Sequence, residues 1–198
     1  MDIKLSIVIS VFNEQENIKP LTEKLNQSLL GYEYEIIFVD DGSTDKTVEN
    51  IKNLNDVRIH LIELQKNYGQ SSALSAGIDY ASGDYVVTMD GDLQNDPADI
   101  PAMVKMAVDG DWDVVAGIRK NRQDNWVRKI PSKIANAVIR RTTGVGVVDN
   151  GCALKVFKTN LAKNIGLYGE LHRFISVLAA LEGGRITQMG VNHHPRVY

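Results

Sequence analysis

Residues 85–97 read Tyr-Val-Val-Thr-Met-Asp-Gly-Asp-Leu-Gln-Asn-Asp-Pro, and this stretch decides the fold of the 198-residue chain. A β-branched apolar run ends in two carboxylates, Asp90 and Asp92, and the amide Gln94 follows. The run predicts a buried strand, and Pro97 is typical of the first turn of a helix. Two carboxylates one residue apart at the end of a strand can share a hard divalent cation, which takes oxygen ligands and bridges to phosphates. The stretch therefore indicates a metal-assisted site for a phosphate-bearing ligand.

Strand and helix signals alternate on both sides of this stretch. We expect strands at residues 5–12, 35–39, 57–64, 85–89, 113–118, 153–157 and 186–191. We expect helices at residues 17–30, 44–51, 71–81, 97–107, 126–141 and 170–182, the second of them capped by Ser43 and Thr44. Strands separated by helical patterns imply βαβ units. The predicted fold class is α/β, with a mostly parallel central sheet flanked by helices.

Polar residues follow three of the predicted strands. Asn13 and Glu14 follow the first strand, Asp40 and Asp41 follow the second, and the carboxylate pair described above follows the fourth. In open parallel sheets, ligands bind beyond the carboxyl ends of the strands. We therefore expect the three acidic loops to share one binding site, where Gly91 would allow unusual backbone angles or the close approach of a phosphate.

Charge is distributed unevenly, although the net charge is only −3. Residues 1–118 carry eight Lys or Arg and 21 Asp or Glu, whereas residues 119–141 carry eight Lys or Arg and Asp124 alone as acidic residue. An acidic region that holds a nucleotide phosphate would need a metal, and the basic segment would suit phosphates or an anionic membrane surface. Its apolar stripe, with Trp126, predicts a basic amphipathic helix at 126–141. The alternative is that the basic segment is an ordinary charged face exposed to solvent.

Several classes of protein fit the sequence poorly. The single cysteine, Cys152, excludes an internal disulfide and is expected to be a small buried residue. No signal peptide and no apolar run near the roughly 18 residues that span a bilayer are evident. Phe12-Asn13-Glu14 after the first strand replaces the Gly-rich turn of a Rossmann oxidoreductase. We expect no nucleic-acid partner, and the stop at Tyr198 directly after the last strand favours a longer natural protein.

Residues 6–14, 35–45 and 89–97 together resemble family 2 glycosyltransferases of the A-type fold. They are most similar to the branch that makes polyprenyl-phosphate sugars, and the similarity extends over nearly the whole chain. The resemblance implies a nucleotide-diphospho-sugar transferase fold, a UDP- or GDP-linked sugar as donor, and Mg²⁺ or Mn²⁺ as cofactor. It implies that residues 1–118 bind the nucleotide-sugar and that residues 119–198 form the acceptor-binding half of the same domain.

The resemblance also implies roles for matching residues on the donor side. The nucleoside pocket would be lined by Phe12, Glu14, Asp40 and Asp41. The main metal ligands would be Asp92 and Gln94, while Asp90 would lie near the metal, the donor sugar and the diphosphate.

On the acceptor side, residues 149–155 resemble the acceptor-loop motif of the family. Asp149 is the acidic residue of that motif and the candidate base. Candidates for phosphate-binding cations are Arg119, Arg128 or Lys129, and Arg196. The helix from Glu170 aligns with the stretch that closes the acceptor side, where many relatives carry a Glu-Asp pair and this chain has Glu-Leu-His-Arg.

The charge pattern also bears on the acceptor. A sugar hydroxyl needs a general base, whereas a lipid phosphate is largely ionised at neutral pH and needs cations. Because residues 119–141 are rich in cations, we predict an inverting metal-dependent glycosyltransferase that moves a hexose to an undecaprenyl- or dolichyl-type phosphate at the cytoplasmic face of a membrane. Transfer to a saccharide hydroxyl, with Asp149 as base, stays open, as do a non-catalytic nucleotide-binding module and an oligomeric state.

Overall fold

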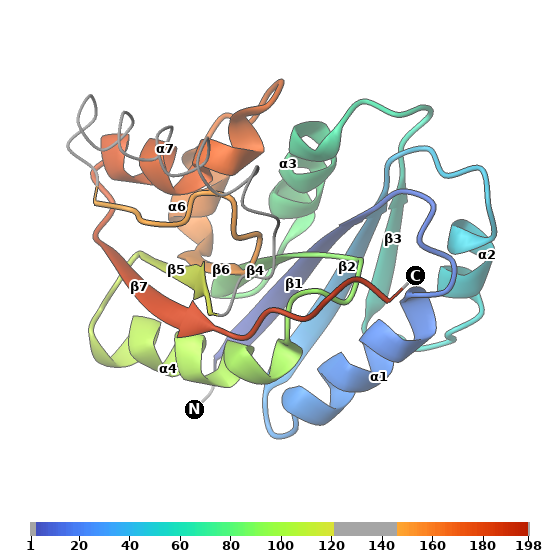
Figure 1. Ribbon diagram of the computed structural model, residues 1–198, viewed down its shortest axis with the longest axis horizontal. Coiled ribbons are helices and arrows are strands. Elements are labelled where there is room, and N and C mark those ends of the chain that lie inside the picture. Colours follow the sequence, from blue (N-terminus) through green and yellow to red (C-terminus); the bar gives the residue numbers. More distant parts are fainter. Residues whose placement is uncertain (1–2, 121–145, 198) are drawn as a thin grey trace.

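The computed structural model describes residues 3–120 and 146–197, and within them a seven-stranded sheet forms the centre (Figure 1). The strand order is β3-β2-β1-β4-β6-β5-β7. The strands are β1 (Lys4–Val11), β2 (Glu33–Asp40), β3 (Ile59–Glu63), β4 (Tyr85–Asp90), β5 (Val114–Arg119), β6 (Lys155–Lys158) and β7 (Ile186–Val191). All neighbouring pairs are parallel except the two that β6 makes with β4 and β5. The predicted fold class, a mostly parallel sheet flanked by helices, is confirmed.

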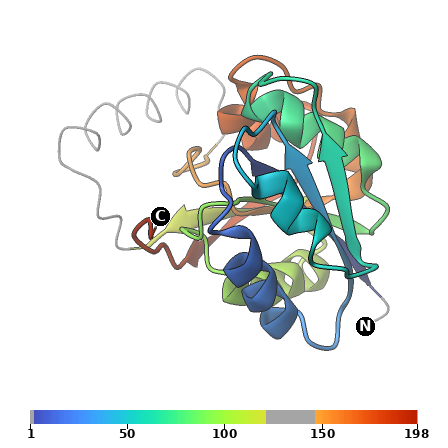
Figure 2. The ribbon, with the colours of Figure 1, turned by 90° about the vertical axis from the view of Figure 1, so that its right-hand side faces the viewer.

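Helices cover both faces of the sheet, as the two perpendicular views show (Figures 1 and 2). One face carries α1 (Ile18–Ser28), α2 (Thr47–Lys52) and α4 (Ile100–Asp109). The other face carries α3 (Gln70–Tyr80), α6 (Thr159–Asn164) and α7 (Ile175–Leu181). Two short 3-10 turns, η1 (Pro97–Asp99) and η2 (Leu171–Phe174), lead into α4 and α7. Among the helices of the described residues, none combines the length and the apolar character needed to cross a membrane.

The strands read as continuous apolar runs because both faces of the sheet are buried. Successive side chains of a strand point to opposite faces. Ile7 and Ile9 therefore pack with the core under α1 and α4, whereas Val8 packs with the core under α3. Cys152 has no exposed surface, as the sequence predicted.

The predicted cap of the second helix is wrong. The helix α2 begins at Thr47, and the backbone N–H of Thr47 donates to the Asp45 carboxylate at 2.9 Å. Ser43 Oγ instead accepts the backbone N–H of Asn13 at 2.9 Å, and the backbone N–H of Thr44 donates to Asn13 Oδ1 at 2.8 Å. These bonds join the loops that follow β1 and β2, so the polar residues shape the carboxyl edge of the sheet.

Gly91 serves packing and not an unusual backbone angle. The residue with positive φ in this loop is Leu93, at 62°, and Gly91 is not among the positive-φ glycines. A Cβ atom at Gly91 would lie 2.7 Å from Cγ1 of Val11, which is too close for any side chain. A larger residue would therefore push β1 away from the end of β4.

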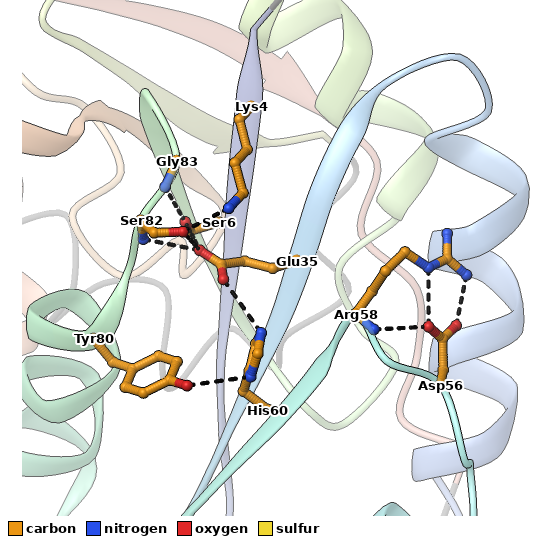
Figure 3. A network of polar contacts seen from close by, with 9 residues as sticks. All are labelled: Lys4, Ser6, Glu35, Asp56, Arg58, His60, Tyr80, Ser82 and Gly83. Carbon is orange, nitrogen blue, oxygen red and sulfur yellow. Dashed lines mark hydrogen bonds and ion pairs between the residues drawn. The ribbon is translucent and has the colours of Figure 1, made fainter.

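A buried carboxylate links β1, β2 and β3 to the turn before β4, near the amino ends of the strands (Figure 3). Glu35 Oε1 accepts hydrogen bonds from Ser6 Oγ at 2.6 Å and from the backbone N–H and hydroxyl of Ser82, both at 2.8 Å. Its other oxygen lies 3.4 Å from Nε2 of His60, whose Nδ1 is 3.2 Å from the Tyr80 hydroxyl. The network fixes the end of the sheet opposite the acidic loops.

Replacing Glu35 with Gln should lower stability at pH 7 by about 1–3 kcal/mol, because buried donors lose a charged acceptor. Burial alone raises the pKa of Glu35, but hydrogen bonds from Ser6 and Ser82 outweigh it and hold the pKa below its usual 4.5. The stability that ionised Glu35 contributes is therefore present above about pH 4.5. It is lost as the pH falls through the lowered pKa that Glu35 has in the folded protein. Urea unfolding at pH 7 and pH 3 should show the difference between parent and variant shrinking in acid. The exposed Glu33→Gln on the same strand is the matched control, and an equal effect there would contradict the assignment.

Candidate functional site

A cleft of about 360 Å³ opens at the carboxyl ends of β1 and β4. Parallel pairing in register brings the loop residues to this edge, since Ser10 of β1 lies beside Asp90 of β4 and Val11 lies beside Asp40 of β2. The cleft is lined by five of the residues that the sequence proposed: Phe12, Glu14, Asp41, Asp90 and Asp92. The structure thus brings together side chains that lie up to 80 positions apart in the sequence.

Asp41 holds the wall of the cleft in place. Its two carboxylate oxygens accept the backbone N–H groups of Tyr68 at 2.7 Å and Gly69 at 2.9 Å. Its own backbone N–H donates to the carbonyl of Val11 at 2.9 Å. The loop after β3 is therefore fixed against the end of β1. Phe12, with 44% of its surface exposed, offers a flat apolar face on the cleft where a nucleobase can stack.

Asp40 lies outside the residues that line the cleft and is 3% exposed. Its Oδ2 accepts the backbone N–H groups of Gly42 at 3.1 Å and Ser43 at 3.0 Å. Gly42 has a φ of 77°, and a Cβ atom there would lie 2.7 Å from the backbone carbon of Lys66. Asp40 therefore shapes the turn beneath the cleft, which is a structural role that the sequence interpretation did not distinguish from ligand contact.

Asp90 is the most strongly perturbed carboxylate of the cleft. Burial and then the neighbouring charge of Asp92 raise the pKa of Asp90 to about 6, against a hydrogen bond from Gln70. Gln70 Nε2 donates to Asp90 Oδ1 at 2.6 Å from the first turn of α3. A carboxylate whose pKa is raised by a neighbouring carboxylate is stabilised in its ionised form by a cation placed between the two. The pair is therefore suited to a hard divalent cation.

The predicted ligand Gln94 is oriented by the segment that follows β7. Its backbone N–H donates to Asp92 Oδ1 at 3.1 Å, and its side-chain Nε2 contacts the carbonyl of His194 at 3.4 Å. Among the described residues, no three His, Cys, Asp or Glu side chains gather as a metal cluster. A cation here would rest on Asp90 and Asp92, and its remaining ligands would come from a bound phosphate, from Gln94 or from water.

The tail of residues 192–197 brings a cation to the acidic cleft. Figure 1 shows this tail running from β7 toward the start of α1. The backbone N–H of His194 donates to the carbonyl of Gln94 at 2.9 Å, and Nη2 of Arg196 donates to Glu14 Oε1 at 2.8 Å. Burial raises the pKa of Glu14, an effect that Asp92 strengthens and Arg196 opposes. The structure places Arg196 on a residue of the cleft lining, within reach of an anion bound there.

Arg119 and Asp149 form a buried ion pair. Nε and Nη2 of Arg119 donate to the two carboxylate oxygens of Asp149, both at 2.8 Å, and the side chains are 12% and 10% exposed. This bidentate arrangement is the strongest geometry for such a pair. A carboxylate held by a guanidinium is a weak base. The pair lies outside the cleft lining and beside Gly151, where a Cβ atom would be 3.0 Å from Nη2.

The sequence placed Lys155 in the acceptor-loop motif and His172 and Arg173 in the stretch that closes the acceptor side, but it gave none of them a role beside Asp90. Lys155, His172 and Arg173 line a second, smaller chamber that shares Gln70 and Asp90 with the cleft. Lys155 lies at the start of the antiparallel strand β6, and the sequence carried no signal for the direction of that strand. The predicted basic helix at 126–141, with Arg128 and Lys129, lies outside the described residues.

Comparisons with known proteins agree on one family. The model of the family described as "Glycosyl transferase family 2" matches residues 6–166. The chain is 44% identical over 202 residues to dodecaprenyl-phosphate galacturonate synthase of Rhizobium johnstonii, covering 98% of this chain and 60% of the relative. It is 42% identical over 200 residues to undecaprenyl-phosphate 4-deoxy-4-formamido-L-arabinose transferase of Proteus mirabilis, covering 98% of this chain and 61% of the relative. The chain thus spans about three fifths of the length of these relatives.

Solved structures share the fold. Glucosyl-3-phosphoglycerate synthase from Mycobacterium tuberculosis, in complex with Mn²⁺, UDP and glucosyl-3-phosphoglycerate, matches with a TM-score of 0.79 at 19% identity, covering 98% of this chain and 73% of that chain. A mannosyltransferase from Pyrobaculum calidifontis, in complex with GDP-mannose and Mn²⁺, matches with a TM-score of 0.73 at 20% identity, covering 100% of this chain and 58% of that chain. At these identities the likeness concerns the fold alone.

Proposed function

Because this chain belongs to glycosyl transferase family 2, we propose that it transfers a sugar from a nucleoside diphosphate to a polyprenyl phosphate, with inversion at the sugar carbon and with Mg²⁺ or Mn²⁺. One observation carries the proposal. A single cleft at the carboxyl edge of the sheet is lined by both an exposed aromatic ring and a carboxylate pair. These groups match a ligand that has a flat base and a diphosphate.

Each residue of the cleft then has a distinct task. Phe12 would stack on the base, while Asp41 binds the backbone of Tyr68 and Gly69 and so keeps Gly69 in the wall of the cleft. Asp90 and Asp92 would hold the cation, which neutralises the diphosphate as leaving group. The identity of the base and of the cation belongs to the proposal, since solved structures of this fold carry Mn²⁺ with either UDP or GDP-mannose.

The acceptor is proposed from the charge of the second half and from the relatives. Both relatives are named for polyprenyl-phosphate products. A phosphate that is already ionised needs cations and no base. Arg119, positioned by Asp149, is the proposed contact of the acceptor phosphate, and residues 119–198 are the proposed acceptor half. A lipid acceptor places the reaction at a membrane surface, and we propose its cytoplasmic face, where nucleotide-sugars are available.

Transfer to a saccharide hydroxyl is the second candidate. It needs a base, and Asp149 is the acidic residue beside the acceptor loop. Both oxygens of Asp149 already accept hydrogen bonds from Arg119, so its carboxylate is directed to the guanidinium. The geometry therefore favours the phosphate acceptor.

A donor and acceptor screen tests the function directly. Purified protein is incubated with UDP- and GDP-sugars, and with either undecaprenyl phosphate or a panel of oligosaccharides. We expect nucleoside diphosphate release only when the lipid phosphate is present, with a sugar-linked lipid as product. Product with an oligosaccharide instead would support the second candidate.

Metal-dependent nucleotide binding should be measurable without turnover. We expect UDP or GDP to bind at least about tenfold more tightly with Mn²⁺ than with EDTA, because the cation bridges the carboxylate pair and the diphosphate. Isothermal titration calorimetry measures both affinities. Tight binding with no transfer to any acceptor would indicate a non-catalytic nucleotide-binding module. Binding of neither nucleotide would overturn the assignment of the cleft.

A further inference from the structure

A small chamber lies behind Asp90, on the face of the sheet that α3 and α7 cover. Its walls come from the end of β4, the loop of residues 150–153, the start of β6, and η2. Gln70 and Asp90 line both this chamber and the nucleotide cleft. A nucleoside diphosphate held in the cleft at Asp92 would therefore present its sugar at the mouth of the chamber.

The size of the chamber limits what can enter it. Its free space is about 50 Å³. A single water molecule needs roughly 10–15 Å³ by the same measure. The chamber therefore has room for a few non-hydrogen atoms, which is the size of one substituent of a sugar and less than a whole pyranose ring.

The lining of the chamber is cationic. Lys155 and Arg173 line the chamber, and Asp90 is the single carboxylate among the described residues that line it. Lys155 is 2% exposed, and its ammonium group donates to the carbonyl of Cys152. In the described part of the chain, neither Lys155 nor Arg173 forms an ion pair with a carboxylate. Burial accordingly lowers the pKa of Lys155, as expected for an ammonium group that lacks a bonded anion.

His172 adds a neutral hydrogen-bond donor to the same lining. The Ser71 hydroxyl oxygen accepts the backbone N–H of His172 at 3.0 Å and lies 2.9 Å from the ring Nδ1. In the tautomer whose Nδ1 accepts the Ser71 hydroxyl hydrogen, the ring hydrogen is on Nε2. Burial lowers the pKa of His172, so the neutral ring is the main form at pH 7. The ring therefore offers an N–H group and no competing negative charge.

We propose that this chamber receives a carboxylate carried by the donor sugar, so that the protein transfers a hexuronic acid in preference to a neutral hexose. A carboxylate has three non-hydrogen atoms, which fits the available space. It would be bound by the ammonium of Lys155, the guanidinium of Arg173 and Nε2–H of His172, and it would supply the anion that neither cation has among residues 3–120 and 146–197. The inference rests on the proposed function and names the substrate class at the same site.

Matched donors that differ only at C6 test the inference. UDP-glucuronic acid is compared with UDP-glucose, and GDP-mannuronic acid with GDP-mannose, using undecaprenyl phosphate and Mn²⁺. We expect kcat/KM to favour the sugar acid by on the order of tenfold to a hundredfold, because hydrogen bonds to a charged group contribute at this level. Equal rates for acid and neutral sugar would overturn the inference but leave the proposed function intact. No transfer from any donor would count against the function itself.

Variants of the lining residues test whether the chamber binds the donor sugar or the acceptor phosphate, which is the other anion at this site. Arg173→Gln should remove most of the preference for the acid and leave kcat/KM for the neutral sugar within about threefold, whereas Arg173→Lys should keep part of the preference. Lys163→Gln, an exposed lysine on α6, should change neither quantity. If Arg173→Gln instead raises KM for undecaprenyl phosphate equally with both donors, the chamber binds the acceptor and the inference is wrong.

Folding of the variants is checked independently. Arg173 is exposed at the mouth of the chamber, so its replacement should leave the melting temperature unchanged. Lys155→Met changes a buried residue and His172→Asn a half-buried one, and their donor preference is read only from samples with a parental circular dichroism spectrum. Calorimetric titration with UDP alone should be unaffected by Arg173→Gln, because UDP carries no donor sugar on its diphosphate.

Discussion

Replacing Asp92 with Ala should reduce sugar transfer by about a thousandfold or more while the fold is retained. The cation that Asp92 would share with Asp90 stabilises the charge of the leaving diphosphate by several kcal/mol, and each 1.4 kcal/mol corresponds to a factor of about ten. The side chain lies in an open cleft, so its loss leaves no packed cavity. Rates with saturating Mn²⁺ and calorimetric titration with nucleoside diphosphate would both be measured.

The matched control for this variant is Asp79→Ala. Asp79 is an exposed carboxylate on α3, far from the cleft lining, and its loss should leave rate and nucleotide affinity unchanged. Both variants should melt at the temperature of the parent. An Asp92→Ala protein with full activity would exclude the carboxylate pair as the metal site.

Breaking the pair of Arg119 and Asp149 should cost about 3–5 kcal/mol of unfolding free energy, because either single change removes the bidentate partner of a buried charge. The side chains are only 12% and 10% exposed, so solvent screens the pair little. Asp149→Ala and Arg119→Ala, together with the double variant, form a double-mutant cycle. We expect the double variant to be more stable than the sum of the two single changes predicts, measured by urea unfolding.

A variant of the same pair distinguishes a positioning role of Asp149 from a role as general base. Asp149→Asn keeps the shape and one acceptor oxygen for Arg119. If Asp149 positions Arg119, this variant should mainly raise KM for the acceptor phosphate and leave the pH profile of kcat unchanged. If Asp149 is a general base, kcat should fall by roughly a hundredfold to ten-thousandfold and the acid limb of the profile should disappear. Asp109→Ala, which breaks the exposed pair with Lys105, is the surface control.

The sheet and its acidic edge could be predicted because they depend on local pattern. Uninterrupted β-branched runs such as residues 85–89 occur where both faces of a strand are covered. Polar residues that end such runs meet at one edge of the sheet through parallel register alone. That rule is sufficient to place Glu14, Asp41 and Asp92 in one cleft from the sequence alone.

The rest of the site depends on tertiary contacts that the pattern does not encode. Asp40 and Asp41 are neighbours in sequence, yet one turns under the cleft and the other faces it. Asp149 is held by Arg119, thirty positions earlier, so its role as base could not be assessed from the motif. Lys155 is a buried charge at the start of β6, and a strand pattern gives no indication of which ligand would compensate it.

The reversed strand β6 has a consequence for how the two halves of the chain are joined. An antiparallel strand begins at the edge where its parallel neighbours end, so β5 ends at Arg119 and β6 begins at Lys155 on one rim of the sheet. These two points are tied by the bond from the backbone N–H of Gly117 to the carbonyl of Leu154, at 3.0 Å. The same rim carries the acidic cleft beyond the end of β4. The sheet itself is therefore the common frame that fixes both the cleft and the two points where the chain leaves and re-enters the sheet.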